Sequence, residues 1–347
     1  MQAVVLAGGR GQRLHPLTTR VPKPLIPVMG RPLLGHLLDH LENRGIDEVF
    51  VTAGYLGSEI VRFLDAAPRL LPVHVVQEPA VRGTAGAVAD LLPALRGPFL
   101  VISGDAVVDL DVARLRAAHT SSLAIATICA APPQDRVRFG VIATHGSLVE
   151  TFVEKPALED LLPGLVVNTG CYLLEPEALE GVAAHGAVDF ARDVFPRLLL
   201  QGARVATAPG LRYWRDIGTA EAFRDIHLEA ASGSWPWSAS DRAAPPHLGR
   251  DASVIGPAIF GSGVTLGTGA RLLGPVYVGD RVSIGAHARV ARSVLLAHSR
   301  IGTHAEVEGT VVDCGSAVAC GTAVSGALIS RVDRPLPHAV PRMPACS

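Results

Sequence analysis

The stretch QAVVLAGGRGQRLHPLTTRVPKPL, residues 2–25, runs from an apolar segment straight into a glycine-rich loop. The aliphatic residues at its start predict a buried strand. Glycines at 8, 9 and 11 let the backbone approach a ligand closely, and successive amides there can hold phosphate oxygens. The loop lacks the GK[ST] ending of a P-loop and the third glycine of the dinucleotide fingerprint. The stretch therefore predicts an α/β protein with a different kind of phosphate site.

Further apolar runs alternate with amphipathic stretches through residue 230. The runs are DEVFVTAG (47–54), PVHVVQE (72–78), PFLVISGD (98–105) and SLAIATICA (122–130). Helices are predicted over RPLLGHLLDHLENRG (31–45) and GTAGAVADLLPALRG (83–97). This alternation predicts a Rossmann-like mixed sheet, mostly parallel, with ligands at the carboxyl ends of its strands.

The hydrophobic period changes to six residues after a Ser-, Pro- and Ala-rich linker at 231–250. Aliphatic or aromatic residues recur at Phe260, Leu266, Leu272, Val278, Ile284, Val290 and Leu296, and after a five-residue step at Ile301, Val307, Val312, Val318 and Val324. This repeat predicts a left-handed parallel β-helix of about four coils over 251–330, followed by a tail at 331–347. An open sandwich of short strands is the alternative.

Composition narrows the classes of function. The net charge is −1 and no dense run of basic residues occurs, so a nucleic-acid surface is not indicated. The opening MQAVVLAGG is not a signal peptide and no apolar span reaches 18 residues, which predicts a soluble cytoplasmic protein without membrane contact. Five cysteines without metal spacing predict free thiols.

Lysine is rare, and both lysines lie in segments that suggest phosphate chemistry. Of the 31 basic residues only Lys23, in VPKPLIP, and Lys155, in FVEKPAL, are lysines. A chain that uses arginine almost everywhere else indicates that a compact ammonium is required at these two places. Chance placement of two lysines is the alternative.

Residues 8–24 resemble the GGxGxRLxPLTxxxPKP signature of the sugar-nucleotide pyrophosphorylases, a family of nucleotidyltransferases. Further segments match that family in the same order: QEPAVRGTAGAV (77–88), FLVISGDAVVDLD (99–111), FVEKP (152–156), VVNTGCYLLEPEAL (166–179) and YWRDIGTAEAF (213–223). The resemblance is strongest to bacterial mannose-1-phosphate guanylyltransferases with a C-terminal hexapeptide-repeat domain.

The resemblance implies a Mg²⁺-dependent enzyme that condenses a nucleoside triphosphate with a sugar 1-phosphate, with GTP and mannose 1-phosphate as the favoured pair. It implies catalytic roles for Arg13, Lys23, Asp105 and Asp216, with Asp105 and Asp216 binding the metal. It places the nucleotide against Leu6, Ala7, Gly8, Gly9, Gly11, Gln12, Gln77, Gly83 and Thr84. It places the sugar phosphate against Gly140, Glu154, Lys155 and Asn168.

Each of these roles has a structural alternative. Asp105 and Asp216 could cap a turn and a helix, and the polar residues at 77, 154, 155 and 168 could be ordinary surface or turn residues. Two positions depart from the family pattern: Gln12 stands where Thr is usual, and Ala106 stands where several relatives have Asn or a larger residue. Both keep the proposed charges and leave the choice of nucleotide and sugar open.

Rival functions follow from the same segments. The base could be uracil, thymine or adenine, the acceptor could be a cyclitol phosphate, and the chain could be a catalytically silent regulatory paralogue. His287, His298 and His304 along the repeat keep open an acetyltransferase site, and regulation of the adenylyltransferase type is a further possibility. The favoured role of the repeat domain is to form a homo-oligomer.

Overall fold

The computed structural model describes residues 1–78, 80–132, 140–154, 165–182, 186–208, 210–237 and 245–331. Its contacts define two compact units. The first comprises Met1–Arg10, Pro22–Pro24 and Leu37–Asp216, and the second comprises Gly11–Val21, Leu25–His36 and the chain from Ile217 onward. The domain boundaries drawn from the sequence at 230 and 250 stay a prediction. Within these described ranges, no helix is both long and apolar enough to cross a membrane.

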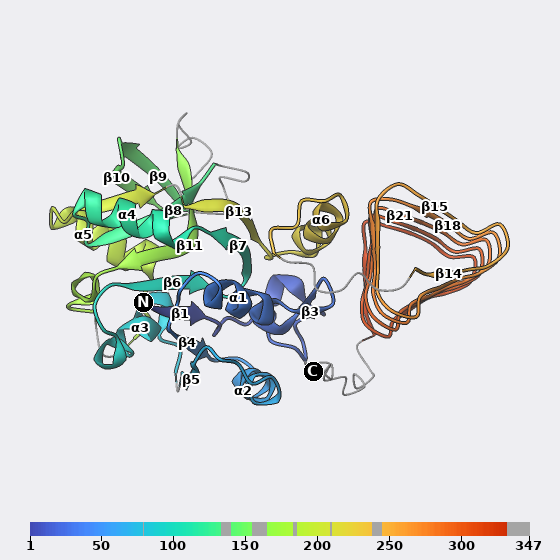
Figure 1. Ribbon diagram of the computed structural model, residues 1–347, viewed down its shortest axis with the longest axis horizontal. Coiled ribbons are helices and arrows are strands. Elements are labelled where there is room, and N and C mark those ends of the chain that lie inside the picture. The colour runs from blue at the N-terminus through green and yellow to red at the C-terminus, as the bar shows by residue number, and fades with distance from the viewer. Residues whose placement is uncertain are drawn as a thin grey trace. The chain divides into compact units, whose positions relative to one another are not determined.

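A nine-stranded mixed sheet forms the first unit, in the order β5-β4-β1-β6-β11-β8-β12-β10-β9 (Figure 1). Its parallel half consists of β5 (Val73–Gln77), β4 (Glu48–Ala53), β1 (Gln2–Leu6) and β6 (Phe99–Ser103). The antiparallel β11 (Val166–Leu174) joins this half to β8 (Ala126–Ala131), β12 (Val205–Ala208), β10 (Leu148–Val153) and β9 (Val141–His145). The Rossmann-like mixed sheet is confirmed, but the expectation of a mostly parallel sheet is wrong, because β11, β10 and β9 pair antiparallel with their neighbours.

The α-helices are α1 (Leu33–Glu42), α2 (Gly57–Ala66), α3 (Gly83–Ala89), α4 (Val112–Ser122), α5 (Phe195–Leu200) and α6 (Ala220–Ala231). A small sheet pairs β7 (Ala106–Leu110) with β13 (Leu211–Asp216), and another pairs β2 (Pro27–Val28) with β3 (Arg31–Pro32). The helix predicted over 83–97 ends early: α3 stops at Ala89, and a 3₁₀ turn follows at Leu92–Ala94. Pro93 explains the break, because proline has no N–H to donate to the carbonyl of Ala89, four residues earlier.

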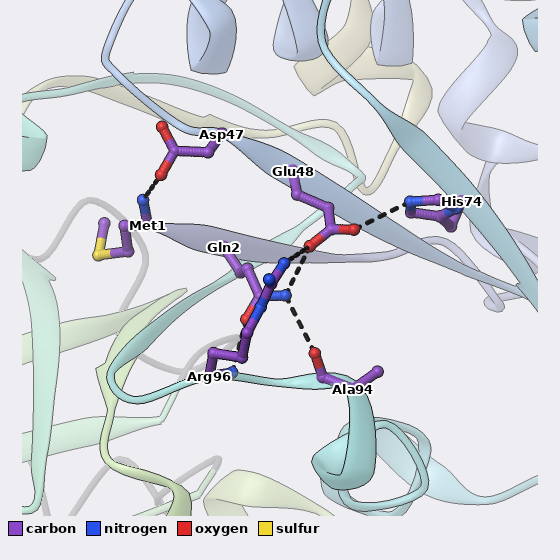
Figure 2. A network of polar contacts seen from close by, with 7 residues as sticks. All are labelled: Met1, Gln2, Asp47, Glu48, His74, Ala94 and Arg96. Atoms are coloured by element: carbon purple, nitrogen blue, oxygen red, sulfur yellow. Dashed lines mark hydrogen bonds and ion pairs between the residues drawn. The ribbon is translucent and has the colours of Figure 1, made fainter.

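A polar network joins the amino ends of β1 and β4 to the segment before β6 (Figure 2). The Gln2 side-chain amide donates to Glu48 Oε2 at 2.6 Å and to the Ala94 carbonyl at 3.0 Å. Arg96 also donates to Glu48 Oε2, at 2.8 Å, and His74 lies 3.1 Å from Oε1. The hydrogen bond from Gln2 contributes most to lowering the pKa of Glu48. The network therefore fastens one end of the parallel strands and leaves their carboxyl ends for ligands.

The C-terminal repeat is a three-sided parallel β-helix, seen as a triangular solenoid in Figure 1. The first side contains β14 (His247–Leu248), β17 (Thr265–Leu266), β20 (Ser283–Ile284), β23 (Arg300–Ile301) and β26 (Ala317–Val318). The second contains β15 (Ser253–Ile255), β18 (Arg271–Leu273), β21 (Arg289–Ala291), β24 (Glu306–Glu308) and β27 (Ala323–Ser325). The third contains β16 (Ala258–Phe260), β19 (Val276–Val278), β22 (Val294–Leu295), β25 (Val311–Val312) and β28 (Leu328–Ile329). The predicted β-helix is confirmed.

Two details of the repeat differ from the sequence prediction. Each side has five strands rather than about four coils, because the solenoid already begins at His247. The short step also lies earlier than predicted: Val278 pairs with Leu295, and Leu295 rather than Leu296 belongs to the apolar core. Both 295 and 296 are leucine, so the sequence pattern does not distinguish them.

Glycines in the repeat allow the coils to stack closely. A Cβ atom on Gly285 would lie 2.5 Å from the backbone nitrogen of Thr303 in the next coil. Gly285 directly follows the inward Ile284, which is why the repeat alternates a core aliphatic with a small residue. The predicted assembly of subunits through this domain stays a prediction.

Helix α6 packs against the third side of the solenoid. That side presents a second, outward row of apolar residues in register: Ile259, Tyr277, Val294, Val311 and Leu328. The His227 ring of α6 lies 4.8 Å from the Tyr277 ring, and Arg224 donates to the Gly309 carbonyl at 3.0 Å. The helix therefore covers apolar surface that the solenoid would otherwise expose.

Two histidines are buried in the neutral form, one in each unit. His227 is fully buried; its Nδ1 donates to the Phe223 carbonyl at 2.8 Å and its Nε2 accepts from the Met29 amide at 3.3 Å. His40 Nε2 accepts from the Leu110 amide at 3.0 Å. Burial lowers the pKa of each to about 4, and Arg44 adds to the effect on His40. Protonation of a ring nitrogen that accepts a hydrogen bond would break that hydrogen bond, because the nitrogen would lose its lone pair.

We expect the protein to lose stability as the pH falls from 7 to 5. The unfolded chain binds protons to both histidines near pH 6.5, whereas the folded chain resists protonation until about pH 4. Stability is therefore full above pH 6.5 and declines below it, by about 2 kcal/mol per histidine at pH 5. Chemical denaturation at pH 7, 6 and 5 measures this decline. His227→Gln should flatten the pH dependence, and an unchanged slope in that variant would rule out the role of His227.

Candidate active site

At the carboxyl ends of β1, β4 and β5, the glycine loop after β1 lies against Gly54, which follows β4, and Glu78, which follows β5. A Cβ atom on Gly8 would collide with the Glu78 carboxyl group, and one on Gly54 would lie 2.9 Å from the Gly8 carbonyl. The Glu78 amide donates to the Ala53 carbonyl at 2.8 Å, which extends the pairing of β5 with β4. Partial burial raises the pKa of Glu78. Leu6 ends β1, and Ala7 and Gly9 lie beside Gly8 in the same loop.

The predicted nucleotide-binding segment contains three residues with different surroundings. Gln77 is exposed, and its side-chain nitrogen would lie 2.9 Å from a Cβ atom added to Gly57. Gly83 has φ +72°, and its α-carbon packs directly against the backbone of Val188. The Thr84 hydroxyl donates to Asp189 at 2.8 Å. Gly83 and Thr84 thus have structural reasons for their identity, and their contact with a nucleobase stays a prediction.

Strand register brings the two predicted metal ligands together from distant parts of the chain. β13 pairs antiparallel with β7, and Asp216 lies opposite Ala106, the residue directly after Asp105. Asp105 itself occupies the turn between β6 and β7. The Ser103 hydroxyl donates to Asp105 Oδ1 at 2.6 Å and fixes the orientation of that carboxylate.

Lys23 lies between these two carboxylates. Its ammonium donates to Asp105 Oδ2 at 2.5 Å and lies 3.8 Å from Asp216 Oδ1. The lysine side chain is 7% exposed, against 34% for Asp105 and 18% for Asp216. Burial opposes ionisation of Asp105, but the charge and hydrogen bond of Lys23 outweigh it and lower the pKa of Asp105. The structure therefore joins three of the four predicted catalytic residues in one charged cluster.

The donor set of this cluster fits Mg²⁺. Two carboxylates converge on one point, and hard oxygen ligands of this kind suit a small divalent cation. No group of three or more His, Cys, Asp or Glu side chains arranged for a metal occurs among the residues with assigned structure. Mg²⁺ is commonly bound by one or two carboxylates together with substrate phosphates, so two ligands are sufficient on the protein side.

Three of the four residues predicted to bind the sugar phosphate also lie together. The Gly140 carbonyl accepts from the backbone N–H of Asn168 at 2.8 Å. A Cβ atom on Gly140 would lie 2.7 Å from the Glu154 carboxylate. Asn168 begins a bulge in β11, where its Oδ1 accepts from the Gly170 amide at 3.1 Å. Bulges of this kind often direct side chains toward an active site. Lys155 lies outside the described residues.

The remaining predicted residues belong to the second unit. Gly11 has φ 62° and precedes a 3₁₀ turn, Gln12–Leu14, that contains Gln12 and Arg13. The Thr18 hydroxyl donates to the Gly11 carbonyl at 2.8 Å and closes this loop on itself. Gln12 and Arg13 are exposed. Their roles in nucleotide binding and catalysis stay predictions.

Two residues that contact the predicted site residues were not predicted from the sequence. Ser103 holds Asp105, and a hydroxyl two residues before a predicted metal ligand was the available signal. Glu78 follows Gln77 directly and lies against Gly8, and its position next to a predicted base-binding residue was the available signal.

Comparison with known proteins places the chain in a family. A model described as nucleotidyl transferase matches residues 2–233. The mannose-1-phosphate guanylyltransferase of Mycobacterium tuberculosis is 33% identical, over 74% of this chain and 72% of its own length. The UTP–glucose-1-phosphate uridylyltransferase of Synechocystis is 33% identical, over 63% of this chain and only 60% of its own length. The glucose-1-phosphate adenylyltransferase of Paraburkholderia phytofirmans is 27% identical over 96% of this chain and 92% of its own length.

Proposed function

The chain belongs to the nucleotidyl transferase family, as its sequence predicted, and we propose that it joins a nucleoside triphosphate to a sugar 1-phosphate. The products are a nucleoside-diphosphate sugar and pyrophosphate. The observation that carries this proposal is the convergence of Lys23, Asp105 and Asp216 at the end of the central strands. We propose the cytoplasm as its location.

The chemistry needs charge and alignment more than a reactive side chain. A phosphate oxygen of the sugar 1-phosphate attacks the α-phosphorus, and the bond to the departing pyrophosphate oxygen breaks. The attacking group is already an anion, so no general base is required. Lys23, with Arg13, would neutralise charge on the transferring and departing phosphates. A divalent ion held by Asp105 and Asp216 would supply charge neutralisation between the two substrates.

Binding of the sugar is assigned to the cluster at the β9, β10 and β11 ends. Gly140 leaves room beside Glu154, whose carboxylate can accept from sugar hydroxyls. Asn168 can donate from its side-chain amide, which now donates to the Tyr172 hydroxyl at 3.0 Å. Lys155, the next residue after Glu154, would bind the phosphate of the sugar.

We propose guanine as the base bound by the predicted nucleotide-binding residues at the Gly8 loop. Glu78 presents a carboxylate beside the Gly8 loop, and Gln77 precedes it. The edge of guanine offers two adjacent donors, N1–H and the N2 amino group, which match the two oxygens of a carboxylate. Uracil and thymine offer a single N–H between two carbonyls. GTP is therefore the proposed nucleotide, and mannose 1-phosphate is the proposed acceptor because a mannose-1-phosphate guanylyltransferase is among the similar proteins.

We expect GTP with mannose 1-phosphate to give the highest kcat/KM in a pyrophosphate-release assay. The assay compares GTP, ATP, UTP, CTP and dTTP against mannose, glucose and N-acetylglucosamine 1-phosphates. Glu78→Gln should lower kcat/KM for GTP on the order of 10²-fold, because the amide replaces one of the two acceptor oxygens with an NH₂ donor that faces a donor of guanine. The preference of GTP over UTP should shrink in the same variant.

Glu59→Gln is the matched control, since Glu59 is a surface carboxylate paired with Arg62 on α2. It should leave the preference among nucleotides unchanged. Preference of the wild-type protein for UTP or dTTP would refute the guanine assignment and spare the reaction class. Absence of turnover with every pair would favour a silent paralogue or an unusual sugar-like phosphate.

A further inference from the structure

Lys23 is a cation that both metal-binding carboxylates share. Its ammonium is 2.5 Å from Asp105 Oδ2 and 3.8 Å from Asp216 Oδ1, and its side chain is 7% exposed. The second oxygen of Asp105 is held by the Ser103 hydroxyl at 2.6 Å. The ammonium therefore lies at the point where the two carboxylates converge.

A divalent ion bound to both aspartates would need the same oxygen atoms. Mg²⁺ requires oxygens at about 2.0–2.1 Å in octahedral geometry. A positive charge already placed on Asp105 Oδ2 removes one ligand and repels the incoming ion. Free metal must therefore displace the buried Lys23 ammonium from its ion pair with Asp105 before it can bind.

The described part of the protein supplies few other ligands that could stabilise a bound metal ion once Lys23 is displaced. Among the described residues no third carboxylate, histidine or cysteine completes a metal site. The remaining ligands must come from water or from phosphate oxygens. A triphosphate supplies both missing parts, because it brings metal ligands and also gives the ammonium a new set of anionic oxygens.

We infer that Lys23 excludes free divalent ions from Asp105 and Asp216 and releases the two carboxylates only when a nucleoside triphosphate binds the ammonium. The inference rests on the proposed function, since it takes the two aspartates as the metal ligands. Metal and nucleotide then bind with positive coupling, and each raises the affinity of the site for the other by the same factor. The metal enters the site together with the nucleotide.

The test is a titration of the full-length protein with Mn²⁺ in the absence of substrate. Electron paramagnetic resonance measures the concentration of the free ion at each step. Lys23→Met removes the charge and keeps a side chain of similar length. We expect Lys23→Met to bind Mn²⁺ with a Kd at least about 10-fold lower than that of the wild type. Lys23→Gln should do the same if methionine disturbs folding, and Lys23→Arg, which keeps the charge, should bind Mn²⁺ as weakly as the wild type.

Arg44→Met is the matched control, because Arg44 forms a 2.8 Å ion pair with a different carboxylate, Asp109. It should leave Mn²⁺ affinity unchanged. Equal affinity of the wild type and both uncharged Lys23 variants would overturn the inference. The double variant Lys23→Met with Asp105→Asn distinguishes the inference about Lys23 from the metal assignment itself. Loss of the Mn²⁺ affinity that Lys23→Met gained supports the inference. Retained affinity means the ion binds elsewhere, which refutes the metal assignment itself.

Discussion

Asp105→Asn and Asp216→Asn are each expected to lower kcat on the order of 10³-fold while leaving the fold intact. An amide has nearly the shape of a carboxylate but lacks the charge that a hard divalent cation prefers. Each substitution also leaves the Lys23 ammonium with one carboxylate instead of two. Pyrophosphate release at saturating substrates measures the loss, and circular dichroism checks the fold.

Asp111→Asn provides the comparison from the same segment of chain. Asp111 caps α4 by accepting from the Arg114 amide at 3.0 Å, and asparagine caps helices equally well. This variant should keep nearly the wild-type rate. A wild-type rate in either Asp105→Asn or Asp216→Asn, or turnover without any divalent metal, would contradict the metal assignment.

The sequence predicted both parts of the fold because each has a strong period. Apolar runs separated by helices required the parallel half of the sheet, and the six-residue repeat required the solenoid. The details that escaped prediction depend on local chemistry. Pro93 ends a helix that the apolar pattern would have continued, and two neighbouring leucines at 295 and 296 hide where the coil shortens.

The site was less accessible to sequence reasoning, because contacts between distant segments depend on register. Family motifs named Asp105 and Asp216 separately, but the pairing of Asp216 with Ala106 is what brings them together. Ala106 departs from the family pattern, yet it lies buried in the strand pair that positions both aspartates. The supporting hydroxyl of Ser103 has no motif of its own. The role of Ser103 depends on the conformation of the turn, which brings its hydroxyl to Asp105.

The surroundings of Lys23 explain why lysine, although rare in this chain, occurs at this position. Its ammonium is buried between two carboxylates, where a compact charge with three donors can reach both. An arginine there would need to fit a planar fork into the same space, and its charge is spread over a larger group. Composition therefore indicated the residue, and the geometry explains why the common basic residue of this chain does not replace it.

Lys23→Arg is accordingly expected to lower kcat/KM on the order of 10²-fold, which corresponds to about 2.7 kcal/mol of transition-state stabilisation. The charge beside Asp105 is kept, so the loss would come from position: the planar fork cannot approach the transferring phosphate as the compact ammonium does. Steady-state kinetics for both substrates measure it. Arg62→Lys, the reverse exchange on the exposed face of α2, should leave the kinetics unchanged. Near-normal kinetics in Lys23→Arg would mean that charge alone matters at this position, and the shape of the ammonium would then have no part in catalysis.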